Sequence, residues 1–481
     1  MNDMHGAGRG PEKKHYHLIG IGGTAMGSLA GLLRAAGHTV TGSDENVYPP
    51  MSDQLQQLGI PYREGYSPNN LEPTPDVIIV GNAISRGNPE LESVLNRKLY
   101  YTSAAVTIKE EFIRGRISMA VAGTHGKTTT TSLLAWVMEC AGFAPSFLIG
   151  GVAENFGVSY RLTDSKIFVI EADEYDTAYF DKGPKMWHYL PDIAIVNNIE
   201  FDHADIYRDE EAYNFAFARF INLIPGNGTL VAGWDSPIVR RLAGKSFAPV
   251  ESFGYAASES EKPRWTAQDV RFESSVTRFS AYHDGRKWGD VVTPMAGAFN
   301  VRNCLATIAA AVAAGAEREG ILEGLRSFKS VRRRMEVRGE VNGVTVIDDF
   351  AHHPTAVRET IEATRQRYGK RRIVAVFEPR SYTAQRREFQ DDYARAFADA
   401  ETIIVAGLFH PERYTSQTAL DPNLLVATWR SAGKQADYIP EPDRIVEHLM
   451  QTLQGDEVVL IMSNGGFGGI HGKLLSALEK R

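Results

Sequence analysis

The stretch from residue 117 to residue 140 constrains the fold more than any other part of this 481-residue chain. Ile117 to Ala122 is an apolar run typical of a buried strand, and Thr129 to Cys140 has apolar residues at helical spacing. A glycine-containing turn, Gly123-Thr-His-Gly-Lys-Thr128, separates them. A buried strand, a glycine turn and a helix in this order predict an α/β unit built on a parallel sheet.

The turn is typical of a loop that binds phosphate. Glycines let backbone N–H groups approach phosphate oxygens, and the helix N-terminus adds partial positive charge. Lys127 would reach the β- and γ-phosphates, and the Thr128 hydroxyl would bind Mg²⁺. The eight-residue P-loop pattern requires glycine where this chain has Val121, but the core Gly-x-x-Gly-Lys-Thr is intact. The alternative is an ordinary turn with a surface lysine. We predict an ATP or GTP site formed by Gly123, Thr124, His125, Gly126, Lys127, Thr128 and Thr129.

Composition narrows the class of protein. The length predicts about three domains, and a net charge of −7 gives no reason to expect a nucleic-acid or membrane partner. The two cysteines, Cys140 and Cys304, lie in apolar helical patterns and predict buried free thiols in a reducing cytoplasm. No stretch has the apolar core of a signal peptide or the length of a membrane span.

The first part of the chain contains a dinucleotide-binding fingerprint. A short strand from Tyr16 leads into Gly20-Ile-Gly22-Gly23, a helix follows, and a second strand ends at Asp44. This pattern predicts a diphosphate on a helix N-terminus and a ribose or base near Asp44. Taken alone, it also fits a nicotinamide-dependent dehydrogenase.

Polar residues follow the apolar strands of the second part. The strand from Ile167 ends in Glu171, which is placed like an Mg²⁺-binding acid facing a P-loop; a helix cap or a surface acid is the alternative. His203 follows a later strand, but Mg²⁺ prefers oxygen ligands, so the spacing leaves its role open. Asn300 and Asn303 lie one helical turn apart and either contact adenine or cap a helix.

The third part repeats the alternation of strands and helices. Its strands end in Asp349-Phe-Ala-His352, in Glu378-Pro-Arg380-Ser381 and in a glycine-rich loop from Ser463 to His471. The sequence therefore predicts an α/β protein of three doubly wound domains. They are a Rossmann-like domain over residues 1–114, a P-loop domain over 115–329 with a small antiparallel extension from about Val231 to Pro294, and a second Rossmann-like domain over 330–481.

Three such units, with these residues at their junctions, resemble the Mur ligase family of ATP-dependent, amide-forming enzymes in bacterial cell-wall synthesis. The resemblance covers essentially the whole chain after residue 15. It rests on Gly20-x-Gly22-Gly23-x-x-Met26, Gly123-Thr-His-Gly126-Lys127-Thr128, Glu171-Ala-Asp-Glu, Asn198-x-Glu200-x-Asp202-His203, Asn300-x-x-Asn303, Arg333-Arg334 and Asp349-Phe-Ala-His352-His353-Pro354.

The resemblance implies a role for each of these segments. Lys127, Glu171, His203 and Arg334 would be catalytic, and Mg²⁺ would be held by Thr128, Glu171 and His203. ATP would also contact Asn300, Asn303, Arg334, Asp349 and His352. A UDP-sugar would bind Gly20, Gly22, Gly23, Met26, Asp44, Asn82, Ala83 and Ser85. Some members carry a carbamylated lysine after the metal-binding histidine, but this chain has no lysine between Lys185 and Lys245.

The implied reaction is amide formation through an acyl phosphate. The lactyl carboxylate of UDP-N-acetylmuramate attacks the γ-phosphorus of ATP, and an amine then displaces phosphate. Three segments resemble the branch that attaches L-Ala-γ-D-Glu-meso-diaminopimelate during peptidoglycan recycling: Glu200 to Ile206, Phe377 to Ser381 and Met462 to His471. Arg380 and Ser381 would bind that peptide; a structural ion pair is the alternative for Arg380.

Other functions remain to be separated from this one. The branch that adds L-alanine in biosynthesis typically has a Gln-Pro-His-Arg-Tyr type sequence where this chain has Glu378-Pro-Arg-Ser-Tyr382. A dehydrogenase leaves the P-loop unexplained. A non-catalytic nucleotide switch has no need for the polar residues at the strand ends of the third part.

Overall fold

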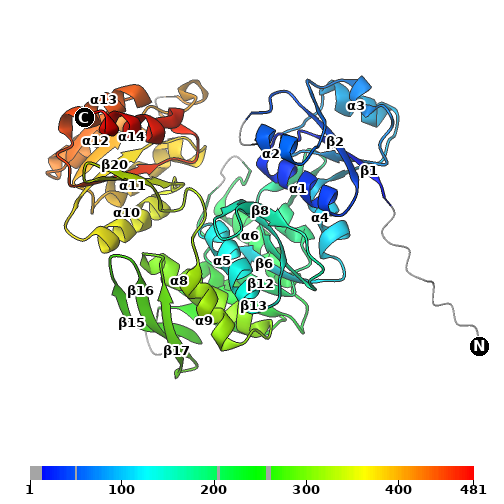
Figure 1. The fold of residues 1–481 in the computed structure, drawn as a ribbon, viewed down its shortest axis with the longest axis horizontal. Coiled ribbons are helices and arrows are strands. Elements are labelled where there is room, and N and C mark those ends of the chain that lie inside the picture. Colours follow the sequence, from blue (N-terminus) through cyan, green and yellow to red (C-terminus); the bar gives the residue numbers. More distant parts are fainter. Residues whose placement is uncertain (1–12, 49–50, 203–205, 256–261, 416) are drawn as a thin grey trace, which may run out of the picture.

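The computed structural model describes residues 13–48, 51–202, 206–255, 262–415 and 417–481. These residues form three α/β domains, each around its own main sheet, which confirms the predicted fold class. In Figure 1 the N-terminal domain (blue) and the C-terminal domain (yellow to red) both adjoin the central domain (cyan to green). Within the described parts of the chain, no helix combines the length and the apolar character needed to cross a membrane.

The N-terminal domain has a five-stranded sheet in the order β3-β2-β1-β4-β5, with all neighbouring pairs parallel. This is the Rossmann-like order, in which ligands bind beyond the carboxyl ends of the strands. Strand β4 is apolar and fully buried, as a strand covered on both faces should be. The elements are β1 (His15–Ile19), α1 (Thr24–Ala35), β2 (Thr39–Asp44), α2 (Met51–Gln57), β3 (Tyr62–Glu64), β4 (Val77–Val80), α3 (Pro89–Asn96), β5 (Tyr101–Ser103) and α4 (Ala104–Ile108).

The central domain has a ten-stranded mixed sheet in the order β17-β16-β15-β14-β13-β12-β6-β9-β7-β8. Its elements are β6 (Ile117–Ala122), α5 (Lys127–Cys140), β7 (Ser146–Ala153), β8 (Val158–Arg161), β9 (Ile167–Glu171), β10 (Asp176–Ala178), β11 (Asp181–Pro184), β12 (Ile193–Val196), α6 (Glu210–Asn222), β13 (Thr229–Gly233), α7 (Pro237–Ala243), β14 (Val250–Gly254), β15 (Trp265–Phe272), β16 (Thr277–His283), β17 (Arg286–Thr293), α8 (Ala298–Ala313) and α9 (Arg318–Ser327).

The P-loop strand β6 lies between β9 and β12 and is parallel to both. The residues that follow these three strands therefore share one edge of the sheet. Strands β15, β16 and β17 form the predicted antiparallel extension, which begins only at Trp265 because β13 and β14 still pair in parallel. Cys304 is buried as expected, whereas Cys140 is only partly buried.

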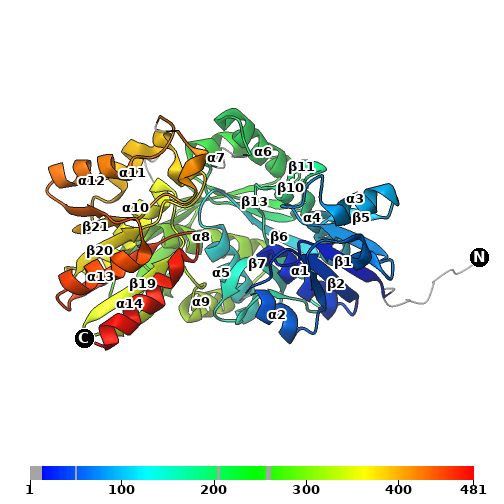
Figure 2. The same cartoon turned by 90° about the horizontal axis from the view of Figure 1, so that it is seen from above.

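The C-terminal domain has a six-stranded sheet in the order β18-β19-β23-β20-β21-β22, parallel except for β18. Figure 2 shows β19, β20 and β21 following one another across this sheet. Strands β19, β23 and β20 are neighbours, so the polar segments at their carboxyl ends meet at one edge. The elements are β18 (Glu336–Val341), β19 (Val344–Asp349), α10 (Pro354–Tyr368), β20 (Arg372–Phe377), α11 (Gln390–Ala396), β21 (Thr402–Val405), α12 (Pro422–Ser431), β22 (Gln435–Tyr438), α13 (Pro442–Thr452), β23 (Glu457–Met462) and α14 (Ile470–Glu479).

A short linker joins the central and C-terminal domains. On its first side, Arg332 N donates a hydrogen bond to Val152 O (3.1 Å), and Ser330 also bonds to the central domain. On its second side, Arg333 Nη2 donates to Ser463 O (2.6 Å) in the C-terminal domain. Ser330 and Arg333 have positive φ values of 78° and 62°, a backbone conformation that side chains other than glycine rarely adopt. The linker is thus held from both domains.

The N-terminal domain packs on the central domain through α1 and the edge strand β8. Ser28 Oγ and Ser159 Oγ are hydrogen-bonded at 2.9 Å. A side chain at Gly31 would place its Cβ 2.1 Å from Tyr160 Cζ, so a larger residue would have to displace the Tyr160 ring from this contact. The contact covers part of an otherwise open sheet edge.

Candidate active site

The P-loop keeps the backbone shape that its glycines predict. Gly126 is the N-cap of α5 with φ 80°, and Gly123 has φ 133°. A Cβ at Gly123 would lie 3.1 Å from Asn197 Cβ, so the loop passes close to the end of β12. His125 N donates to Asn198 Oδ1 (2.8 Å). No role was predicted for Asn197 or Asn198, although Asn198 opens one of the segments on which the family resemblance rests.

Lys127 is held by an internal carboxylate. Its Nζ donates to Glu174 Oε2 (2.8 Å) and Oε1 (3.0 Å) and to Gly123 O (2.8 Å). Glu174 is fully buried, and Tyr213 Oη donates to it as well (3.4 Å). Burial alone would lower the pKa of Lys127, but Glu174 and Asp173 outweigh it and raise the pKa. No pairing with Lys127 was predicted for Glu174, although Glu174 ends the quoted segment that begins at Glu171.

Two of the three predicted Mg²⁺ ligands, Thr128 and Glu171, meet beside the P-loop. Thr128 Oγ1 donates to Glu171 Oε1 (2.9 Å), and Gly150 N donates to Oε2 (2.8 Å). Burial and the neighbouring Asp173 raise the pKa of Glu171 to about 7. A hydroxyl and a carboxylate are the hard oxygen donors that Mg²⁺ prefers, so these residues fit the ion. His203 lies outside the described residues.

Asn300 and Asn303 lie on the first turns of α8, and both are buried. Asn303 Nδ2 donates to Asn300 Oδ1 (3.0 Å). The helix is capped by Gly297, so the alternative that these asparagines cap it is wrong. A Cβ at Gly126 would lie 3.0 Å from Asn303 Oδ1, which places Asn303 against the P-loop. Adenine binding by the pair stays a prediction.

Arg334 reaches the P-loop from the linker to the C-terminal domain. Its Nη2 donates to Thr128 Oγ1 (3.3 Å), and its guanidinium carbon lies 4.9 Å from the centre of the Phe350 ring. A positive charge therefore stands beside the hydroxyl predicted to bind Mg²⁺.

Asp349 and His352 bond mainly to backbone near the linker. Asp349 accepts hydrogen bonds from Met335 N (2.7 Å) and Ala351 N (2.8 Å), and its burial raises its pKa. His352 Nδ1 lies 2.9 Å from Phe350 O. Asp349 thus shapes the turn that carries Arg334, and contact of either side chain with ATP stays a prediction.

Arg380 lies at the carboxyl end of β20 with its guanidinium carbon 3.7 Å from the centre of the Phe409 ring. Its Nη1 is 3.7 Å from Glu378 Oε1. A Cβ at Gly465 would lie 2.2 Å from Arg380 Nε, so the side chain lies directly over that glycine. Ser381 Oγ accepts a hydrogen bond from the backbone three residues later (3.0 Å). The position of Phe409 gave no signal in the sequence.

The fingerprint loop of the N-terminal domain has the expected shape. Gly20 has φ 88°, and Gly23 is the N-cap of α1. Gly22 N donates to Asp44 Oδ2 (2.8 Å), so the acidic residue closes the loop itself. Met26 is only 6% exposed and packs in the hydrophobic core that supports the loop.

The loop after β4 contributes the other predicted UDP-sugar residues. Asn82, Ala83 and Ser85 are all exposed. Asn82 Nδ2 donates to Asp176 Oδ1 (2.9 Å), which links the loop to the central domain. This loop and the fingerprint loop follow neighbouring parallel strands, β4 and β1.

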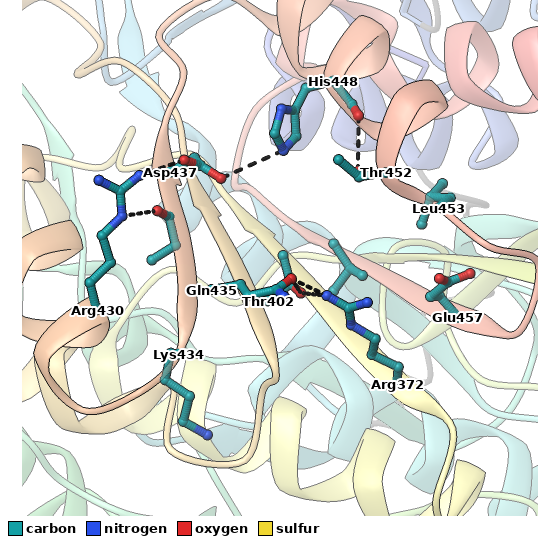
Figure 3. A pocket seen from close by; sticks show the side chains of 12 residues that line it. Arg372, Thr402, Arg430, Lys434, Gln435, Asp437, His448, Thr452, Leu453 and Glu457 are labelled. Carbon is teal, nitrogen blue, oxygen red and sulfur yellow. Dashed lines mark hydrogen bonds and ion pairs between the residues drawn. The ribbon is translucent and has the colours of Figure 1, made fainter.

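A cavity of about 290 Å³ lies in the C-terminal domain at the opposite edge of the sheet (Figure 3). Arg372 and Glu457 line it from the first residues of β20 and β23. Arg430 Nη2 donates to Asp437 Oδ1 (2.6 Å), and Lys434 donates to a backbone carbonyl at 2.8 Å. Its cations are thus engaged by the protein, and the predicted site residues lie at the other edge.

Comparison with known proteins agrees with this architecture. The models called "Mur ligase family, catalytic domain", "Mur ligase middle domain" and "Mur ligase, glutamate ligase domain" match residues 15–111, 121–311 and 333–465. The chain belongs to the Mur ligase family, whose members are ATP-dependent amide ligases, as the sequence predicted.

Its relatives include two kinds of ligase. An Escherichia coli protein named UDP-N-acetylmuramate–L-alanyl-γ-D-glutamyl-meso-2,6-diaminoheptandioate ligase is 42% identical over 97% of this chain and 98% of its own length. The UDP-N-acetylmuramate–L-alanine ligase of Syntrophus aciditrophicus is 32% identical over 97% and 94%. The crystal structure of a murein peptide ligase from Psychrobacter arcticus matches with a TM-score of 0.71 and 36% identity, over 97% of this chain and 99% of that one.

Proposed function

We propose that this chain joins UDP-N-acetylmuramate to the tripeptide L-Ala-γ-D-Glu-meso-diaminopimelate, with cleavage of ATP to ADP and phosphate, in peptidoglycan recycling. The observation that carries the proposal is the identity of 42% to the tripeptide ligase of Escherichia coli, against 32% to an L-alanine ligase over the same share of the chain. The sequence Glu378-Pro-Arg380-Ser381 at the end of β20 supports it. Because the reaction consumes ATP, we place it in the cytoplasm.

The first step brings two anions together. An oxygen of the lactyl carboxylate attacks the γ-phosphorus, the bond to the β-phosphate oxygen breaks, and ADP leaves. Lys127 and Arg334 supply positive charge around Thr128, where repulsion between the carboxylate and the polyphosphate must be overcome. When bound by Thr128 and Glu171, Mg²⁺ would neutralise part of the phosphate charge. Positioning dominates this step, because little proton transfer by the protein is needed.

The second step forms the amide bond. The α-amine of the peptide attacks the acyl carbon, loses a proton, and inorganic phosphate leaves. Arg380 would bind a carboxylate of the peptide, because a planar guanidinium pairs with a carboxylate through two hydrogen bonds. Its stacking on Phe409 would hold the guanidinium in one orientation. Contact between the central and C-terminal domains would keep water from the acyl phosphate.

Phosphate release tests the proposal directly. The purified chain is given ATP, Mg²⁺ and UDP-N-acetylmuramate, with either the tripeptide or L-alanine as acceptor. We expect release, and a product of the mass of the UDP-linked tripeptide, with the tripeptide only. Release with L-alanine only would assign the chain to biosynthesis instead. Release without any acceptor would indicate a nucleotide hydrolase rather than a ligase.

A further inference from the structure

Three metal-ligating side chains from two domains converge beside the P-loop. They are His125 of the P-loop, Glu200 in the segment after β12, and His353, the N-cap of α10. One ligand atom from each lies within 4.8 Å of the other two. Thr128 and Glu171, the described ligands of the predicted Mg²⁺ site, are not members of this group.

The distances suit a small tetrahedral ion. His125 Nε2 lies 3.2 Å from Glu200 Oε2, and His353 Nδ1 lies 3.7 Å from the same oxygen. Zinc–nitrogen and zinc–oxygen bonds of about 2.0–2.1 Å place neighbouring tetrahedral ligands roughly 3.3 Å apart. Small side-chain rotations would therefore bring all three atoms within bonding distance of one ion.

The ring of His353 is largely enclosed by protein, with its side chain 8% exposed. Its Nδ1 atom, which lies on the side of Glu200, accepts only a long hydrogen bond from Thr355 N (3.4 Å) that a metal would replace, and its Nε2 atom is buried without a hydrogen-bond partner in the described structure. Buried imidazole nitrogens normally have a partner. Burial and the nearby His125 lower the pKa of His353 to about 3, so its ring is neutral and able to bind a metal. Burial alone would raise the pKa of Glu200, but the hydrogen bond from His125 and the charge of that imidazole lower it to about 2.

We propose that His125, Glu200 and His353 form a binding site for a zinc-class divalent ion that ties the P-loop to the C-terminal domain. Two imidazoles and one carboxylate are a donor set that zinc accepts, with the fourth position left to water, whereas Mg²⁺ prefers oxygen alone. The ion would fix this arrangement of the two domains, because neither domain holds all three ligands. Zinc would then inhibit turnover by restraining the loop that must receive ATP.

Equilibrium dialysis against Zn²⁺ tests the proposal without any substrate. The full-length chain is dialysed in excess Mg²⁺, and bound zinc is counted by mass spectrometry. We expect one zinc per chain, with affinity reduced at least about 100-fold in His353→Gln and in Glu200→Gln, since even loss of an outer partner costs 10–100-fold. His448→Gln is the matched control: its Nε2 also faces a carboxylate, Asp437 at 3.6 Å, and among the residues that the structure describes no third metal ligand joins this pair. This control should bind zinc like the wild type.

Two further measurements distinguish other sites and folding defects. If His203→Gln still binds zinc, the zinc is not bound at the predicted Mg²⁺ site. If His203→Gln no longer binds zinc, the proposal is overturned. Cobalt bound to the wild type should give the intense visible bands of tetrahedral coordination, bleached by Zn²⁺. Absence of zinc from the wild type, octahedral cobalt, or equal binding by wild type and His353→Gln would each refute the site. Because no substrate is present, these results are independent of the proposed ligase activity.

Discussion

Replacing Lys127 with alanine tests both the P-loop assignment and the buried ion pair. In the structure, its Nζ lies within 3.0 Å of both oxygens of Glu174, and Glu174 has no exposed surface. Alanine leaves this carboxylate buried without its cation, at a cost of about 3–5 kcal/mol. For a domain of about 150–250 residues, that corresponds to a fall in melting temperature of roughly 6–20 °C. We expect scanning calorimetry to show this fall for the central domain.

The double variant Lys127→Ala/Glu174→Gln separates stability from catalysis. It removes the negative charge of Glu174 together with the cation of Lys127, so the double variant should recover most of the thermal stability that the single variant loses. Ligation should stay abolished in both variants, because neither has the cation that would contact the phosphates. A single variant that melts like the wild type would show that the pair is not buried as described. A double variant that forms the amide at the normal rate would refute the P-loop assignment.

Three other predictions concern the remaining parts of the site. Gly465→Ala should displace Arg380 and raise the KM for the tripeptide about 10- to 100-fold, since hydrogen bonds to charged groups contribute about 1.5–3 kcal/mol. Gly466→Ala is the control: a Cβ at Gly466 would have no atom within 4 Å, so this variant should leave the KM for the tripeptide unchanged. The pKa of Glu171 is raised to about 7, and the protonated acid cannot bind a cation. The affinity for Mg²⁺ should therefore fall about tenfold per pH unit below pH 7 and level off above it. Mg²⁺ titrations of Glu171→Gln at the same pH values should not show this dependence. Gly126→Ala, at φ 80°, should cost about 1–3 kcal/mol of backbone strain and raise the KM for ATP, and an unchanged KM would contradict the loop geometry.

The sequence predicted the three-domain fold because its signals are local. Apolar runs such as Val77–Val80 and Ile117–Ala122, each followed by a glycine turn, specify parallel strands wherever they occur. The same reasoning placed Glu171 beside Thr128, because strand ends in a parallel sheet share an edge. The predicted start of the antiparallel extension near Val231 was wrong, because β13 and β14 pair in parallel and the direction of pairing depends on partners far away in the chain.

Side-chain partners between distant segments could not be predicted. Glu174 pairs with Lys127 across 47 residues, and nothing in its neighbourhood distinguishes it from a surface acid. His353 meets His125 only because the C-terminal domain docks on the central one. The capping alternative for Asn300 was wrong because Gly297, at φ 97°, already supplies the helix start.

The linker at residues 330–335 determines how far each part of the site can travel. Its backbone hydrogen bonds to the central domain end at Arg332, and its bonds to the C-terminal domain begin at Arg333, so a rotation of one domain against the other would pivot on the peptide unit between these two residues. Arg334 lies next to this pivot, so such a rotation would move it little relative to Thr128. Arg380, carried at the end of β20 in the swinging domain, has a longer lever arm and sweeps a wider path. One rotation would therefore leave the charge at the phosphate almost fixed while delivering or withdrawing the guanidinium that is proposed to hold the peptide.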